Sequence, residues 1–431
     1  MNILVLYNCE ELPLRATVRD HLYSLRRYSP HRCFYLNVMV QGVPWYIGKV
    51  RFDLIVFHTI FLSARWSLDG FRHLLGKARA LKHVDAVKVA VPQDEFIHTD
   101  VLCDFINEFK IECVFSAASE PDRRKIYAGV APGAVRFFQV LTGYLDDETV
   151  RRVNRLAESA PARTVDVGYR AWRSEPWLGR HGLLKSEIAE LFQREAPRKG
   201  LVTDISTRGE DTFLGDAWYE FLLRCKYMIG VEGGASILDR DGAIKRRTEE
   251  YLARHPGAGF EEVEANCFPN LDGSLRLFAI SPRHLEACST RTCQVLVEGE
   301  YNGILKPGLH YIELRRDLGN LEEVLETMRR DEAREEIVER AYRDVVASGR
   351  YSYRSFVELV LGESLRHAEG RPRSLPQRIY GCAVYCWMRL VDAPAWARVR
   401  LGARYYLAAL RAAARKALRG ASGMLVRADE K

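Results

Sequence analysis

The sequence predicts an α/β protein with two doubly wound, Rossmann-like domains that face a cleft, followed by a basic helical C-terminal tail. Short runs rich in Val, Ile, Leu and Phe alternate with amphipathic segments, which is typical of parallel strands joined by helices. The alternation stops at a linker near residue 160 and then restarts, and residues 371–431 are strongly basic. At roughly 100–200 residues per domain, the 431 residues of the chain accommodate two such domains.

The first predicted domain spans residues 1–160. Its expected strands are residues 3–7, 54–57, 87–91 and 113–116, with helical patterns such as 17–27 and 67–81 between them. Largely apolar runs of this length suit strands that are buried on both faces of a parallel sheet. Ligands of such sheets bind beyond the carboxyl ends of the strands, where Asn8, His58 and residues 92–95 stand.

The second predicted domain spans residues 161–345. Its expected strands are residues 164–169, 201–205, 227–231, 275–280, 294–297 and 310–314, and helical patterns at 184–194, 218–225, 243–254, 282–289 and 321–329 separate them. Residues 346–370 are expected to form a closing helix, and residues 371–431 a basic amphipathic tail.

The positive charge of the chain is concentrated in this tail. Residues 371–431 hold 13 Lys and Arg against 3 Asp and Glu, whereas residues 1–370 hold 51 against 54. The near-neutral charge of residues 1–370 argues against a nucleic-acid partner. The charge distribution indicates that residues 371–431 are the part that binds an anionic surface. Residues 397–419 predict either a solvated helix that packs back on the protein or an amphipathic helix on an anionic membrane surface. Near such a surface each Lys or Arg contributes about 1 kcal/mol, and Trp387 and Trp396 suit the headgroup layer.

The N-terminal residues and the cysteines indicate a cytoplasmic protein. The chain starts with a run that is typical of a first strand rather than a signal peptide. Its 10 cysteines form no CxxC pair and no zinc-binding spacing, so we expect them to be reduced and mostly buried. No run of about 20 uncharged apolar residues is present. Together with the basic tail, this predicts a peripheral protein at the inner membrane face.

Two basic residues are candidates for binding a diphosphate. Arg170 ends a predicted strand, and Lys185 lies near the start of the helix that follows. A strand-end Arg and a helix-start Lys can face one anion, and helix N-termini add free N–H groups. The alternative is that the two residues are surface ion-pair partners.

Residues 230–236 follow a predicted strand and are rich in glycine. Glu232, Gly233, Gly234 and Ser236 are candidate ligand contacts, because glycines permit close backbone approach and the Ser hydroxyl can bond a phosphate. No Gly-Lys-Ser/Thr follows, so this is not a P-loop. A plain turn with positive φ is the alternative.

A third cluster opens the helix that is predicted at 282–289. Arg283, His284 and Glu286 lie in its first turns, and a carboxylate there can hold ribose or sugar hydroxyls. The alternative is an Arg–Glu pair on one helical face. Glu298 follows the next strand, in an acidic and glycine-containing segment that also indicates a ligand edge.

These residues carry a family resemblance. The order of Arg170 and Lys185, the Pro-Arg-His-Leu-Glu-Ala segment at 282–287 and the Pro-Gly-Leu-His-Tyr-Ile-Glu-Leu segment at 307–314 resemble the C-terminal half of GT-B glycosyltransferases. The likeness is greatest to the group-1 branch with the CgeB-like proteins, and it covers about residues 165–361. It implies that Arg170 and Lys185 contact the donor diphosphate and that Glu286 contacts the donor ribose or sugar. The group-1 enzymes often carry a second Glu eight positions earlier, where this chain has Phe278.

The first domain is expected to hold the acceptor. Asp94, Glu95 and His98 follow a strand end, where a base for the acceptor hydroxyl can stand. For Asp94 a helix N-cap is an equal alternative, and His58 is interpreted as a satisfied core histidine or a site residue.

The resemblance implies a metal-independent glycosyltransferase that moves a sugar from a nucleotide-sugar donor to a polysaccharide or lipid-linked glycan acceptor. Such an enzyme serves cell-surface glycan or lipopolysaccharide synthesis, and it needs no cofactor beyond the nucleotide-sugar substrate. Asp239 and Asp241 have the spacing of a metal pair but follow the glycine-rich segment, so we expect no metal. Two other functions stay open: a sugar-nucleotide epimerase of the same fold, and a non-catalytic sugar-binding or scaffold protein, which Phe278 favours.

Overall fold

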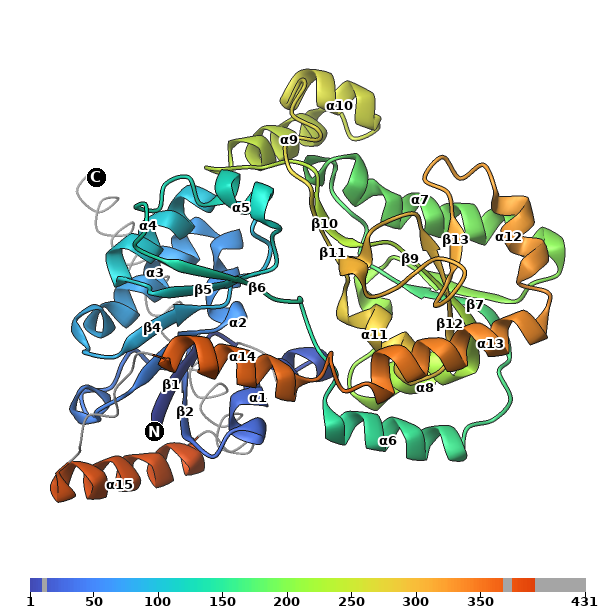
Figure 1. The fold of residues 1–431 in the computed structure, drawn as a ribbon. Helices are drawn as coiled ribbons and strands as arrows, with labels where there is room; N and C mark the ends of the chain where they lie inside the picture. Colours follow the sequence, from blue (N-terminus) through green and yellow to red (C-terminus); the bar gives the residue numbers. More distant parts are fainter. Residues whose placement is uncertain (10–13, 367–373, 392–431) are drawn as a thin grey trace, which may run out of the picture.

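The computed structural model describes residues 1–9, 14–366 and 374–391, which form two α/β domains side by side (Figure 1). The first domain contains a six-stranded parallel sheet in the order β2-β1-β3-β4-β5-β6. Its elements are β1 (Asn2–Tyr7), α1 (Ala16–Tyr28), β2 (Arg32–Asn37), β3 (Leu54–Phe57), α2 (Thr59–Leu62), α3 (Leu68–Ala78), β4 (Val87–Ala90), α4 (Thr99–Phe109), β5 (Cys113–Ser116), α5 (Glu120–Ile126) and β6 (Arg136–Gln139).

The second domain contains a five-stranded parallel sheet in the order β13-β12-β9-β7-β8. Its strands are β7 (Val165–Arg170), β8 (Thr203–Ser206), β9 (Cys225–Gly230), β12 (Cys293–Val297) and β13 (Ile312–Leu314). The helices that cover it are α7 (Arg180–Glu195), α8 (Asp216–Arg224), α11 (Pro282–Ser289), α12 (Leu321–Thr327) and α13 (Asp331–Ala341). Two Rossmann-like domains with parallel sheets are the fold that the sequence predicts.

The strand order reverses once in each sheet. In the first domain the chain passes from β1 to β2 on one side and then to β3 on the other. In the second domain β8 and β9 lie on opposite sides of β7. Helices that leave such a pair of strands diverge to opposite faces, which opens a crevice at the carboxyl ends. Strands β1, β3 and β12 are buried along their length, so the inner parts of the sheets are rigid supports for side chains at these ends.

The chain crosses between the two domains at two helices, α6 and α14. Helix α6 (Asp147–Glu158) packs against α8 and α11 of the second domain, although the sequence places it in the first. Its Val153 is fully buried among Trp218 and Phe221, and this apolar contact explains the placement. Helix α14 (Tyr353–Leu365) returns to the first domain and packs on α1 (Figure 1). The two crossings are joined, because Leu145 accepts from the Tyr353 N–H at 2.8 Å.

An insertion between β9 and α11 bridges the two domains. It comprises β10 (Gly233–Ala235), α9 (Ala243–Arg254), α10 (Phe260–Cys267) and β11 (Leu277–Ala279). Strands β10 and β11 form a separate antiparallel pair, so the predicted strand at 275–280 does not join the main sheet. The His98 N–H donates to the Asp239 carbonyl at 2.8 Å, and the rings of Trp66, Phe96 and Trp177 form a contact across the domain boundary.

Helix α15 (Leu375–Val391) lies beside β2 on the side of the first domain away from the second domain (Figure 1). Among the described residues no helix is long and apolar enough to span a bilayer. Residues 397–419, for which the sequence predicts an amphipathic helix, lie outside the described residues, as does Trp396.

Candidate functional site

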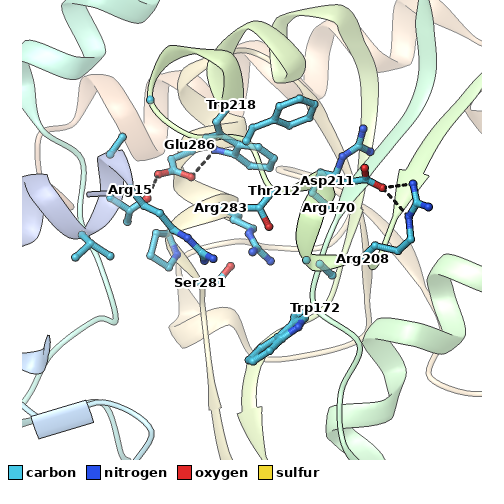
Figure 2. Close-up of a pocket in the computed structure, with 18 residues that line it drawn as sticks. Arg15, Arg170, Trp172, Arg208, Asp211, Thr212, Trp218, Ser281, Arg283 and Glu286 are labelled. Atoms are coloured by element: carbon cyan, nitrogen blue, oxygen red, sulfur yellow. Dashed lines mark hydrogen bonds and ion pairs between the residues drawn. The ribbon is translucent and has the colours of Figure 1, made fainter. Parts of the chain in front are cut away.

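A pocket of about 480 Å³ opens where the second domain faces the start of α1. Figure 2 shows side chains that converge on it from the end of β7, from the loop before α8 and from the start of α11. Three of the predicted donor-binding residues line this pocket, namely Arg170, Arg283 and Glu286. Arg15 and Thr17 of the first domain complete one wall, so the pocket lies between the domains.

Arg170 lines the pocket, but its guanidinium already donates hydrogen bonds to acceptors of the protein. It donates to the carbonyls of Tyr169 and Asp204 at 2.9 Å and to Asp204 Oδ1 at 2.6 Å. Its guanidinium carbon also lies over the Phe213 and Phe221 rings, at 4.9 and 4.5 Å from their centroids. The ion-pair alternative therefore describes Arg170, whose partner is Asp204. Arg170 organises the pocket wall and has few donors left for a ligand.

Glu286 is a buried carboxylate with two fixed hydrogen bonds. Its Oε1 accepts from the Thr17 hydroxyl at 2.9 Å, and its Oε2 accepts from the Trp218 indole N–H at 2.8 Å. The side chain is 6% exposed and faces the pocket (Figure 2). Burial raises its pKa, while these two donors oppose the rise. Each carboxylate oxygen retains a lone pair, so Glu286 can accept a further hydrogen bond from a ligand hydroxyl.

Lys185 and Arg283 are two positively charged residues of the site that act on each other. Neither makes an ion pair or a side-chain hydrogen bond with any residue that the structure describes. Burial lowers the pKa of the Lys185 ammonium, the positive charge of Arg283 lowers it further, and Asp94 of the first domain opposes the fall. The two positive charges disfavour each other, Asp94 offsets this only in part, and an anion bound beside them would relieve the remaining cost. The Arg–Glu pair considered for the 282–289 helix is not formed.

Two buried histidines stand beside these cations. His284 closes a capping box at the start of α11, where its Nδ1 accepts from the Ser281 N–H at 3.0 Å. Burial lowers the pKa of His284 to about 3, and Arg283 and Lys185 contribute. Its ring is therefore neutral near pH 7 and carries its proton on Nε2. The sequence predicts His284 as a donor contact, and the structure gives it a local capping role next to that site.

His181 is a site residue that sequence reasoning missed. It lies in the first turn of α7, its Nε2 donates to the Glu232 carbonyl at 3.2 Å, and its Nδ1 accepts from Arg316 at 3.0 Å. Burial lowers its pKa to about 3, with Arg316 and Lys185 adding to the effect. The His181 ring stacks on Phe278 with centroids 3.6 Å apart. Phe278, which stands where a Glu is expected, is the one sequence signal for this contact. The sequence does not show that Phe278 stacks on His181, because His181 lies 97 residues earlier in the chain.

The glycine-rich segment has a different role from the one predicted. Gly233 and Gly234 belong to β10, and a Cβ on Gly234 would lie 1.7 Å from the Leu277 carbonyl oxygen of β11. Gly234 also has φ 115°, which side chains rarely adopt, so strand pairing explains this glycine. Ser236 donates to Asp272 Oδ1 at 2.6 Å and is 5% exposed. These residues support the insertion, and none of the three presents a free group to a phosphate.

A second crevice, of about 790 Å³, lies between β6 with its following loop and the ends of β9 and β12. Glu232, Phe278 and Arg316 line it from the second domain, and Gln139 and Tyr144 line it from the first. Glu232 is 2% exposed, its Oε1 accepts from the Tyr301 N–H at 2.6 Å, and burial raises its pKa. The predicted contact Glu298 is exposed and lies outside both cavities.

The three predicted catalytic residues have separate environments. Asp94 is half-buried at the end of β4, has φ 53°, and accepts from the Trp66 indole N–H at 3.1 Å. Glu95 is fully buried, and its carboxylate accepts from Ser116, Tyr127 and the Ala117 N–H. His98 is buried against Gly242 of the insertion. Of the three, only Asp94 acts on the charge of Lys185, whereas Glu95 and His98 are held in buried contacts away from it.

Hydrogen bonds also define the surroundings of Asp239 and His58. Asp239 is 1% exposed and accepts from the Ile244 and Lys245 N–H groups at the start of α9, so it caps a helix. No cluster of metal-ligating side chains is found among the described residues. His58 is a core histidine, because it is buried and its Nε2 lies 2.7 Å from Nδ1 of His21.

No protein-family model matches the chain, and a comparison with curated protein sequences finds no match. Among solved structures, Anabaena HepE in complex with UDP is similar at 12% identity and a TM-score of 0.44, over 85% of this chain and 100% of HepE. A glycosyltransferase from Rickettsia africae has 11% identity and a TM-score of 0.42, over 86% and 99%. Sucrose-phosphate synthase from Thermosynechococcus elongatus has 10% identity and a TM-score of 0.43, over 85% and 98%. The assignment of the fold rests on the two parallel sheets of the chain itself.

Proposed function

We propose that this chain is a metal-independent glycosyltransferase that moves a sugar from a nucleotide-sugar donor to a polysaccharide or lipid-linked glycan acceptor. The observation that carries the proposal is the pair of cations Lys185 and Arg283 at the domain boundary, which influence each other's charge and make no direct ion pair with any described carboxylate. A nucleoside diphosphate carries the matching charge, and charge-assisted hydrogen bonds contribute about 1.5–3 kcal/mol each.

The pocket beside these cations suits the nucleoside part of the donor. Glu286 can accept from a ribose hydroxyl, because its two protein donors leave lone pairs free. Trp172 is 74% exposed at the pocket mouth and offers an aromatic face to a base (Figure 2). The transferred sugar would then extend toward the second crevice, where Glu232 and Arg316 stand.

The chemical step needs charge stabilisation and a proton acceptor. The bond between the anomeric carbon and the diphosphate oxygen breaks, and its electron pair stays on the diphosphate, whose new charge Lys185 and Arg283 stabilise. The acceptor oxygen forms the new bond and loses its proton, for which Asp94 is the candidate base. Preorganised charges of this kind are typically the largest catalytic term.

We further propose that the enzyme works at the inner membrane face in cell-surface glycan synthesis, which includes lipopolysaccharide. The support is the excess of Lys and Arg in residues 371–431. The direct test is transfer of a radiolabelled sugar by the purified full chain from a panel of UDP-, GDP-, ADP- and dTDP-sugars to glycolipid extracts. Binding without turnover would instead favour a sugar-binding protein, and isomerised donor in the absence of an acceptor would favour an epimerase.

A further inference from the structure

Helix α15 exposes an unusual amount of apolar surface. Leu375, Ile379, Trp387 and Leu390 are 68%, 62%, 54% and 62% exposed. The other exposed large apolar side chains of the described residues lie outside helices. Contiguous exposed apolar surface on one element marks an interaction site more often than scattered single residues do.

These side chains occupy one face of the helix. Residues 375, 379, 382, 386 and 390 follow one another at steps of three or four, which aligns them along a single stripe. Cys382 and Cys386 in this stripe are exposed, whereas the other eight cysteines are buried. We call the stripe, with the flanking Trp387, the outer face of α15.

The opposite face of the helix is already used. Val384 and Met388 are buried in the core of the first domain, and the Tyr385 ring lies 5.2 Å from that of Phe34. The Tyr380 hydroxyl donates to the Tyr46 carbonyl at 3.1 Å. The helix is therefore held on the protein in a fixed orientation that leaves its outer face exposed.

The charges around the outer face are positive. Helix α15 contains Arg378 and Arg389 and no acidic residue. On the adjoining loop, Lys49 lies over the ring of Trp45, which is itself 73% exposed. Residues 392–431, which follow the helix, add nine Lys and Arg against three Asp and Glu. A second copy of the chain would bring these like charges together across a twofold axis, which is unfavourable.

We propose that the outer face of α15 docks on a bilayer that contains anionic lipid, with its apolar stripe in the headgroup layer and Arg378 and Arg389 on lipid phosphates. The helix is too short to span the bilayer, so it lies between the protein and the membrane. This docking surface rests on the proposed function, because it names the part of the enzyme that would contact the membrane in which a lipid-linked acceptor lies. Because α15 lies on the side of the first domain away from the second, docking leaves both interdomain cavities free (Figure 1).

The exposed cysteines provide the test. The full chain with Cys386→Ser is labelled at Cys382 with an environment-sensitive NBD fluorophore and titrated with vesicles of phosphatidylcholine alone or with 30% phosphatidylglycerol. We expect a blue shift and saturable binding with the anionic vesicles only. Ile379→Glu with Leu390→Glu should weaken binding at least tenfold, and Arg378→Gln or Arg389→Gln about fivefold each, since each charge is worth about 1 kcal/mol. Val202→Glu, which changes an equally exposed residue of the second domain, should leave binding unchanged.

The proposal is overturned if the label at Cys382 keeps its emission in the presence of anionic vesicles, even if the chain sediments with them through residues 392–431. It is also overturned if the free protein is a dimer in which Cys382 crosslinks to its copy. Donor hydrolysis and pyrophosphate binding are measured without vesicles in the same samples. Their loss would count against the proposed glycosyl transfer and not against the docking surface.

Discussion

Asp94 of the first domain lies close enough to Lys185 of the second domain for its negative charge to oppose the fall in the Lys185 pKa. Asp94 has a left-handed backbone, and the Trp66 indole holds its carboxylate at 3.1 Å. Strained backbone of this kind is found at functional sites, because the surrounding structure has to maintain it. The pair defines the point where an acceptor held by one domain would meet a diphosphate held by the other.

Removal of the free cations should weaken anion binding. Lys185→Ala and Arg283→Ala are each expected to reduce the affinity for inorganic pyrophosphate and for UDP by about 10- to 100-fold, the equivalent of one charge-assisted hydrogen bond. Isothermal titration calorimetry measures both ligands. Lys199→Ala is the matched control, since Lys199 pairs with Glu322 on the surface. Equal affinities of all three variants would remove the diphosphate site from this position.

Binding of the diphosphate should also depend on pH. The anion needs the protonated form of Lys185, whose pKa is lowered from its usual value of 10.5. Affinity is therefore expected to be full below the lowered pKa and to fall as the pH rises through it. Pyrophosphate titrations between pH 7 and 10 measure this, and Lys185→Arg should shift the loss to higher pH because guanidinium stays protonated. A profile that is the same in both proteins would contradict the assignment.

Glu286 should affect the nucleoside and not the phosphates. Glu286→Gln keeps the size of the side chain but replaces one acceptor oxygen with an NH₂ group, which accepts neither from the protein donor nor from a ribose hydroxyl. We expect about tenfold weaker binding of UDP and unchanged binding of pyrophosphate. Calorimetry on both ligands separates the two effects. Equal weakening of both ligands would indicate a general loss of the pocket instead.

The neighbours Asp94 and Glu95 should respond differently to the same change. Asp94→Asn removes the candidate base and is expected to lower kcat by about 10²–10⁴ with little change in stability. Glu95→Gln leaves a buried network of Ser116, Tyr127 and the Ala117 N–H mismatched, so it should lower the free energy of unfolding by about 1–3 kcal/mol. Steady-state kinetics and denaturant unfolding together distinguish the roles. A stable, inactive Glu95→Gln protein would reverse our assignment.

The two buried histidines of the site predict a loss of stability in acid. Burial lowers the pKa of both His181 and His284 to about 3, below the ordinary value of 6.5. Between these values the unfolded chain binds protons that the folded chain does not, so stability falls as the pH drops from about 6.5 toward 3. Urea unfolding at several pH values measures the slope. His181→Gln should lower the slope by up to one proton, and an unchanged slope would show that His181 titrates normally.

The elements of the fold could be predicted where the apolar runs are continuous. Strands β1, β3, β5 and β9 are such runs, because both faces of a parallel sheet are buried. The sequence does not predict strand β2, because Arg32 and Asn37 shorten its apolar run at both ends. Strands β10 and β11 were misread, since a glycine-rich segment after a strand is typical of a phosphate loop and equally of close strand pairing.

The site could be predicted only in part, because contacts between distant residues are not visible in local patterns. The sequence indicated Arg283, Glu286 and Lys185 through their positions at helix starts. It could not show that Asp204 holds Arg170, or that His181 stacks on Phe278. The separate roles of Asp94 and Glu95 also depend on tertiary contacts, since adjacent side chains at a strand end point in different directions.

The central claim is that Lys185 and Arg283 hold the diphosphate of a nucleotide-sugar donor. A crystal structure of the full chain with UDP or UDP-glucose tests this most directly. We predict phosphate oxygens within hydrogen-bond distance of the Lys185 ammonium and the Arg283 guanidinium, with the ribose against Glu286. A nucleotide bound elsewhere, with both cations still free of phosphate, would contradict the account.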